Sequence, residues 1–261
     1  ARDMDDLREI ISAARGLPLR VLGLGSNVLI RDGLLPGFTL RLAGEFEKLS
    51  AKGTDMTAGA AVPSAVAAAA ARVSNIGGFE FLTGIPGTLG GAVPSNAGCM
   101  GGEISKILTG VETLDSETGA VKKLAAGELD FSYRRCALPK NAVITKLSLR
   151  GEAGRPDEIL AREREIRAKK DAAQPSSERT AGSVFKNPKD KKAWELIRDA
   201  GLQGASVGGA RISEKHANFI IAGDGASAAD IEGLAGLARE KIRALFGITL
   251  EYEMEILGSK A

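Results

Sequence analysis

The chain of 261 residues has few of the residue types that mark several protein classes. It contains two cysteines, Cys99 and Cys136, a single histidine, His216, and only 4% aromatic residues. Two cysteines cannot form a disulfide framework, and none stands at metal-ligand spacing, so we expect no metal site and a reducing, cytoplasmic setting. The most apolar stretch, residues 57–73, is mostly alanine and contains Pro63, so we expect no membrane insertion.

An excess of charge of one sign is also missing. Lys and Arg total 35 against 33 Asp and Glu, a net charge of +2, and no basic stripe is present. Nucleic acid is therefore not an expected partner. Apolar residues make up 44% of the chain, enough for the packed core of one large or two ordinary domains. The chain starts at Ala1 without an initiator Met and enters a helix at once, which indicates an upstream segment.

Hydrophobic periodicity and turn residues predict a mixed, α+β chain. Helices are predicted over residues 3–16, 63–74, 156–170 and 194–200, and from the capping box at Ser227 to Gly247; strands are predicted at 19–22, 28–30, 111–114, 142–149, 218–222 and 248–256. The sequence becomes more highly charged after Gly151, so we place a domain boundary between residues 150 and 151.

Two of the predicted elements carry regular patterns of charge. The helix over 156–170 has i,i+4 pairs at Glu163–Arg167 and Glu165–Lys169. The last strand alternates apolar residues with glutamates, and the pattern by itself favours a solvated face that includes Glu253.

Glycine-rich segments occur twice in the first 100 residues. Residues 23–27 read Gly-Leu-Gly-Ser-Asn, but the third glycine and the helix of a dinucleotide fingerprint are missing, so a Rossmann site is excluded. Such a turn can form a nest of backbone N–H groups for an anion, and an ordinary tight turn is about as consistent with it. Residues 84–98 form the second segment, and the two together predict one long ligand with charges in its middle. A structural loop is the alternative.

Ser183 follows Gly182 and precedes a short run with Lys186 and Asn187 on a predicted turn. It has no histidine nearby and no nucleophile-elbow motif, so acyl transfer is disfavoured. His216 is equally consistent with a structural role and with a functional one.

Taken together, these segments resemble the UDP-N-acetylenolpyruvoylglucosamine reductase family. The resemblance rests on six segments in the family's order, at residues 23–27, 84–98, 131–134, 181–188, 213–219 and 250–258. The spacing after Ser183 is that of the family's shorter form, without an inserted tyrosine loop. The resemblance implies a vanillyl-alcohol-oxidase (PCMH-type) FAD-binding fold of two subdomains over residues 1–150, without the upstream strand that relatives carry. An α+β substrate domain is implied over 151–261, with its last strand returning to the active site.

The resemblance also implies a reaction, in which FAD and NADPH serve to reduce the enolpyruvyl group of UDP-N-acetylglucosamine enolpyruvate to UDP-N-acetylmuramate in peptidoglycan synthesis. Reduced flavin supplies the hydride and Ser183 the proton, while Arg134 and Glu253 stabilise charge on the substrate carboxylate. The residues expected to line FAD are Gly23, Gly25, Ser26, Asn27, Ile85, Pro86, Gly87, Thr88, Gly90, Gly91, Asn96 and Gly98. Those expected to hold the nucleotide sugar are Tyr133, Lys186, Asn187 and His216. Relatives usually have a basic residue at the position of Glu255, so no contact is inferred there.

Two other functions are consistent with parts of the sequence. One is another oxidoreductase of the same FAD fold that acts on an alcohol or lactone, and the other is a nucleotide-sugar binding protein without catalysis. The segments around Ser183 and Glu253 favour the reductase, because neither alternative requires them. No obligate protein partner is expected.

Overall fold

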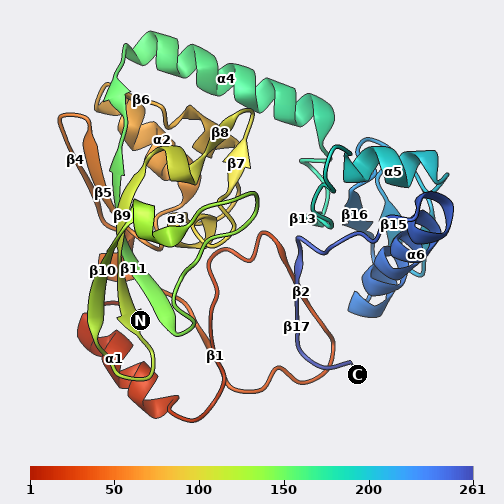
Figure 1. Ribbon diagram of the computed structural model, residues 1–261, viewed down its shortest axis with the longest axis horizontal. Helices are drawn as coiled ribbons and strands as arrows, with labels where there is room; N and C mark the ends of the chain where they lie inside the picture. The colour runs from red at the N-terminus through yellow and green to blue at the C-terminus, as the bar shows by residue number, and fades with distance from the viewer. Residues whose placement is uncertain (261) are drawn as a thin grey trace. The chain divides into compact units, whose positions relative to one another are not determined.

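The computed structural model describes residues 1–260, which form two compact units (Figure 1). Unit 1 comprises Ala1–Leu24 and Gly37–Ala168, and unit 2 comprises Gly25–Pro36 and the chain from Lys169 onward. This division differs from the predicted boundary at 150/151. The early segment 25–36 belongs to unit 2 because β2 (Val28–Ile30) pairs in parallel with β17 (Glu255–Leu257).

Unit 1 is built on an antiparallel sheet of five strands in the order β10-β9-β11-β5-β4. The strands are Leu49–Lys52 (β4), Asp55–Gly59 (β5), Leu108–Asp115 (β9), Val121–Ala125 (β10) and Ala142–Arg150 (β11). In β11, Leu147 and Leu149 are buried whereas Lys146 and Ser148 are exposed, which is the alternation expected of a sheet with one covered face.

The other elements of unit 1 are short, apart from three helices of ten residues or more. The helices are Met4–Ala13 (α1), Ser64–Val73 (α2), Leu89–Ala92 (α3) and Pro156–Ala173 (α4), of which α4 belongs to unit 1 as far as Ala168. The 3-10 turns are Gly44–Glu47, Glu80–Gly84, Ile104–Lys106 and Ala126–Leu129. The small strand pairs are Leu19–Val21 (β1) with Phe38–Leu40 (β3), Ile76–Gly77 (β6) with Glu152–Ala153 (β12), and Gly98–Cys99 (β7) with Gly102–Glu103 (β8). The predicted Asp3 cap is confirmed, since its carboxylate accepts the N–H groups of Asp5 and Asp6.

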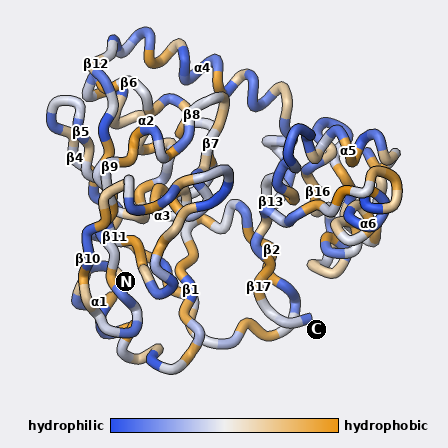
Figure 2. The backbone as a smooth tube through the Cα atoms, in the orientation of Figure 1, coloured by the Kyte–Doolittle hydropathy of each residue, from blue (hydrophilic) through white to orange (hydrophobic). Residues whose placement is uncertain are grey.

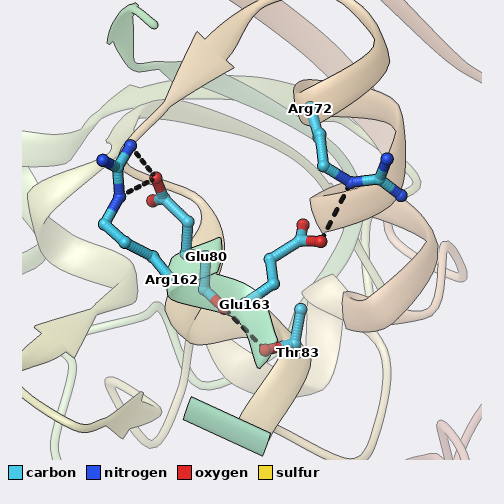
Figure 3. A network of polar contacts seen from close by, with 5 residues as sticks. All are labelled: Arg72, Glu80, Thr83, Arg162 and Glu163. Atoms are coloured by element: carbon cyan, nitrogen blue, oxygen red, sulfur yellow. Dashed lines mark hydrogen bonds and ion pairs between the residues drawn. The ribbon is translucent and has the colours of Figure 1, made fainter. Parts of the chain in front are cut away.

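Two ion pairs attach α4 to the rest of unit 1 (Figure 3). Most of α4 is hydrophilic (Figure 2), with only Ile159 and Glu163 buried. Arg72 Nε of α2 donates to Glu163 Oε2 at 2.9 Å, and Arg162 donates to Glu80 Oε1 through two nitrogens at 2.8 and 2.6 Å. The predicted i,i+4 pair of Glu163 with Arg167 is therefore wrong, because the Glu163 carboxylate faces α2 instead of solvent.

Unit 2 combines a four-stranded antiparallel sheet, in the order β13-β16-β15-β14, with the parallel pair β17-β2. Its further strands are Thr180–Ser183 (β13), Ser206–Val207 (β14), Ala210–Ile212 (β15) and Phe219–Ala222 (β16), and its helices are Ala193–Asp199 (α5) and Ala228–Phe246 (α6). The capping box at Ser227 is confirmed: its hydroxyl accepts from Asp230 N and the Asp230 carboxylate accepts from Ser227 N. Gly247 ends α6 with φ +68°, as predicted.

The predicted last strand, 248–256, is not regular. Only Glu255–Leu257 forms a strand, and before it Tyr252 makes a single bridge to Phe185. The segment first bonds to residues 184–186, and Glu255 N then donates to Asn27 O, so its pairing partner changes along its length. Leu250 and Met254 are buried as a result.

Among the described residues, no helix combines the length and the apolar character that a membrane span requires.

Candidate active site

The two glycine-rich segments meet within unit 1. A β-carbon on Gly23 would lie 2.7 Å from Thr88 Oγ1, so the backbone of the first segment rests directly on a side chain of the second. Thr88 is buried, and its hydroxyl accepts the Gly91 N–H at 3.3 Å at the start of α3. Leu22 N donates to Leu40 O, which fixes the approach to the first segment. Residues that are far apart in sequence thus form one surface of backbone and small side chains.

Two of the predicted FAD-lining glycines have a packing reason of their own. A β-carbon on Gly90 would lie 2.8 Å from Ala60, and one on Gly98 would lie 2.7 Å from Gly102 O. These positions are filled by the chain itself, so their glycines do not require a ligand to explain them. Among the other predicted residues of this segment, Ile85 packs on the core of unit 1, Pro86 is exposed, and Gly87 O accepts from Ser64 N.

Arg134 occupies the tip of a tight turn in unit 1. Ser132 and Arg135 exchange two backbone hydrogen bonds of 3.1 Å, so Tyr133 and Arg134 are the central residues of the turn. Arg134 has φ +54°, a backbone conformation that non-glycine residues seldom adopt and that is concentrated at functional sites. Its guanidinium lies 5.4 Å from the centre of the Tyr133 ring. Two predicted site residues are thereby held side by side.

The side chain of Asn96 is hydrogen-bonded to this turn. Its side chain is buried, donating from Nδ2 to Ser132 O at 3.3 Å and accepting at Oδ1 from Ser105 N at 3.1 Å. Asn96 was predicted to line FAD, but both ends of its amide are bonded to unit 1. Its observed side-chain contacts hold the turn that carries Arg134, and its place beside FAD stays a prediction.

Ser183 and Glu253 come together in unit 2. Glu253 N donates at 2.9 Å to the carbonyl of Val184, the residue after Ser183. The two segments that carry the predicted catalytic side chains are therefore hydrogen-bonded to each other. Both side chains are partly buried. Of the glutamate face that the pattern predicts to be solvated, Glu251 and Glu255 are exposed, whereas Glu253 is only partly so. Gly25, Ser26 and Asn27 also belong to unit 2, and Asn27 contacts the Ser183 segment directly.

Lys186 and Asn187, two of the predicted substrate residues, follow Ser183 in unit 2. Lys186 Nζ lies 3.5 Å from Glu251 Oε2, an exposed carboxylate, and its N–H donates to Glu251 O. Asn187 Oδ1 accepts the N–H of Ala193 at the start of α5. Both side chains are therefore held in place by the fold of unit 2 itself.

His216, the third predicted substrate residue of unit 2, packs among aromatic rings. Its ring centre lies 4.9 Å from that of Phe219 in an edge arrangement and 6.0 Å from that of Trp194. Burial lowers the pKa of His216, although a backbone hydrogen bond opposes the shift. Nδ1 accepts the Asn218 N–H, so the neutral ring carries its proton on Nε2.

The residue that sequence reasoning missed is Asn218. It is buried, and its side chain accepts from Phe185 N at 3.0 Å and donates to Phe185 O at 2.8 Å, while its carbonyl accepts from Val184 N. It therefore clamps the chain immediately after Ser183. Its place in the segment 213–219 was the only signal in the sequence, because its burial and its partners become visible only in the folded chain.

Two family models match the chain: "FAD binding domain" over residues 1–125, and "UDP-N-acetylenolpyruvoylglucosamine reductase, C-terminal domain" over residues 174–257. The UDP-N-acetylenolpyruvoylglucosamine reductase of Granulibacter bethesdensis is 44% identical over 258 residues, which cover 98% of this chain and 82% of that protein. The enzyme of the same name from Methylorubrum populi is 42% identical, with 98% and 83% covered. The chain belongs to the UDP-N-acetylenolpyruvoylglucosamine reductase family.

The crystal structure of the reductase from Thermus caldophilus gives the same result for the fold. It matches with a TM-score of 0.86 and 35% identity over 99% of this chain and 91% of that one. The predicted fold class, an α+β FAD-binding fold followed by a C-terminal α+β domain, is confirmed. The prediction that the protein is an FAD-dependent oxidoreductase is confirmed as well. The roles of the single residues stay predictions.

Unit 1 has features that suit an FAD site. Within residues 1–260, the backbone N–H groups of Leu24, Gly87 and Thr88 donate to no protein acceptor. Gly23 contributes no side chain where the two segments touch. Free N–H donors beside bare backbone match the needs of a pyrophosphate. By contrast, a cavity of about 690 Å³ beside α1 is lined by none of the predicted residues, and the described residues include no cluster of metal-binding side chains.

Proposed function

We propose that this protein reduces the enolpyruvyl group of UDP-N-acetylglucosamine enolpyruvate to a lactyl group, with NADPH as electron source, and so forms UDP-N-acetylmuramate for peptidoglycan. The observation that carries the proposal is the pairing of the Ser183 and Glu253 segments in unit 2, since both motifs are needed for this reaction and neither is needed for flavin binding. Near full-length similarity to reductases of that name supports it.

Bound FAD would supply the hydride that saturates the carbon–carbon double bond. The chain's own residues would then have three tasks. Arg134 offers two parallel N–H donors to the substrate carboxylate, whose negative charge increases as the double bond is reduced. Glu253, when protonated, donates a further hydrogen bond to it. Ser183 Oγ gives its proton to the α-carbon, which completes the addition of two hydrogens across the bond.

The nucleotide part of the substrate needs donors and a ring surface. Lys186 supplies a cation for the diphosphate, and its present partner Glu251 is an exposed carboxylate that water can replace. Tyr133 is 54% exposed and can pack on the sugar or base. Asn187 and His216 Nε2 supply further donors from unit 2.

The proposal is tested by measuring the two half-reactions separately under anaerobic conditions. Ser183→Ala is expected to leave flavin reduction by NADPH within twofold of wild type, while oxidation of the reduced enzyme by the enolpyruvyl substrate slows by at least a hundredfold. Ser206→Ala, which removes an exposed hydroxyl in the same unit, serves as the matched control. Equal loss of both half-reactions would refute the acid role. Steady NADPH oxidation without the enolpyruvyl acceptor would refute the reductase.

A further inference from the structure

Asn27 contacts the backbone on both sides of the residue before Ser183. Its side-chain Nδ2 donates to Ala181 O at 2.6 Å and to Ser183 O at 3.1 Å. Both acceptors are carbonyl oxygens, so only the NH₂ end of the amide can face them. The two hydrogens of that group are thereby used within unit 2, which leaves no side-chain donor for the flavin role predicted for Asn27.

The backbone at Gly182 leaves room for the side-chain amide of Asn27. Gly182 has φ +73°, and a β-carbon there would lie 3.2 Å from Asn27 Nδ2 and 3.3 Å from Ser26 O. The pairing of β13 with β16 shifts register between Thr180 and Ser183, as in a β-bulge. Bulges of this kind change the direction of the side chains beside them. The direction of the Ser183 side chain therefore depends on the hydrogen bonds that close the bulge.

Asn27 also contacts the chain next to Glu253. Its own carbonyl accepts from Glu255 N at 3.0 Å, while Glu253 N donates to Val184 O at 2.9 Å. One residue of the first glycine-rich segment is thus bonded both to the segment that carries Ser183 and to the segment that carries Glu253. A turn that served only to bind a phosphate would have no need of these contacts.

We propose that Asn27 is a positioning residue that holds the bulge at Gly182 and thereby directs the Ser183 hydroxyl at the carbon it protonates. This inference rests on the proposed role of Ser183. A general acid contributes a rate factor of about 10²–10⁴, and a displacement of about 1 Å can remove a hundredfold. Loss of the Asn27 contacts is therefore expected to slow proton delivery by about 10- to 100-fold.

Asn27→Asp is the sharpest test, because it keeps the shape of the side chain and replaces the donor with an acceptor. The variant should retain FAD, reduce it with NADPH at close to the wild-type rate, and react with the enolpyruvyl substrate about 10- to 100-fold more slowly at an unchanged half-saturating concentration. Its solvent deuterium isotope effect on that step should rise, because proton transfer becomes slower. Asn27→Ser keeps one donor and should lie between, and Asn141→Asp in unit 1 controls for the added charge.

A double variant separates the possible failures. Asn27→Asp combined with Ser183→Ala should be no slower than Ser183→Ala alone, because the two residues act on one step. If Ser183→Ala reacts normally with substrate, the proposed function itself fails. If Ser183→Ala is slow but Asn27→Asp is normal, only the inference about Asn27 is overturned. Loss of FAD from Asn27→Asp, with normal rates once FAD is saturating, would assign Asn27 to flavin binding instead.

Discussion

The ion pair between α2 and α4 allows a quantitative prediction about unit 1. The Glu163 side chain is 8% exposed and that of Arg72 is 28% exposed. Glu163 Oε1 is buried and has no hydrogen-bond partner among the described residues, so Arg72 Nε is the main compensation for this carboxylate. Removing one partner of a fully buried pair costs about 3–5 kcal/mol of stability. Because part of Arg72 is open to water, we expect Arg72→Ala to cost about 2–3 kcal/mol.

The two neighbouring arginines of α4 provide graded comparisons. Arg162→Ala should cost less, about 1–2 kcal/mol, because Glu80 keeps the hydrogen bond from Gly78 N and because Arg162 is 48% exposed. Arg164→Ala, at an exposed position, should change stability by less than about 0.5 kcal/mol. The three variants remove similar side chains from nearby positions, so their order isolates the buried charge.

Thermal unfolding and amide hydrogen exchange of α2 and α4 measure the effect. At about 2–4 °C per kcal/mol, Arg72→Ala should lower the unfolding midpoint by roughly 5–10 °C and increase exchange in both helices. Adding Glu163→Gln should recover part of the loss, because the stranded charge is removed. A midpoint for Arg72→Ala that equals that of Arg164→Ala would refute the reasoning.

Two further predictions concern α6 and are checked by chemical denaturation. Gly236→Ala inside the helix should stabilise the protein by about 0.5–1 kcal/mol, since no atom lies within 4 Å of the added carbon. Gly247→Ala should destabilise it by about 1 kcal/mol, because the φ of Gly247 is +68°. Equal effects at both positions would contradict this reasoning. The hydrogen bond from Arg31 lowers the pKa of Glu232, although burial opposes the shift. The stabilising effect of Glu232 over Glu232→Gln should therefore be complete above the ordinary glutamate pKa of about 4.3 and disappear as pH falls below the lowered value. The control Glu240→Gln, at an exposed site, should show a smaller dependence, and a pH-independent difference at Glu232 would contradict the argument.

Local signals explain which elements were predictable. The start of α6 depends on Ser227 and Asp230, three residues apart, and its end depends on Gly247, so both are visible in a short window of sequence. The start of α1 at Asp3 is of the same kind. By contrast, the irregular segment 248–256 alternates like a strand, but its partners at 27 and 184–186 lie far away in the chain. Nothing in the alternation records that the partner changes.

The same limit applies to the candidate site. Ser183, Arg134 and Glu253 could be named only through the family resemblance, because a lone serine or glutamate carries no local signature. The contacts that organise the site span long separations, 154 residues between Asn27 and Ala181 and 33 between Phe185 and Asn218. Asn27 and Asn96 are predicted from the family resemblance to line FAD, and that prediction stays open. What the sequence did not predict is that their side chains bond to the backbone at Ser183 and at Ser132, because these contacts depend on folded geometry.

The pairing of β2 with β17 has a consequence for how this protein folds during its synthesis. Val28–Ile30 leaves the ribosome early, whereas Glu255–Leu257 is made after nearly all of the rest of unit 2. During that interval β2 presents an unpaired strand edge, which is a site where nascent chains associate wrongly. A chain that stalls or is cut before residue 255 leaves this edge without its partner. Translation pauses that lengthen the interval between the synthesis of residue 30 and that of residue 255 are therefore expected to lower the yield of this protein.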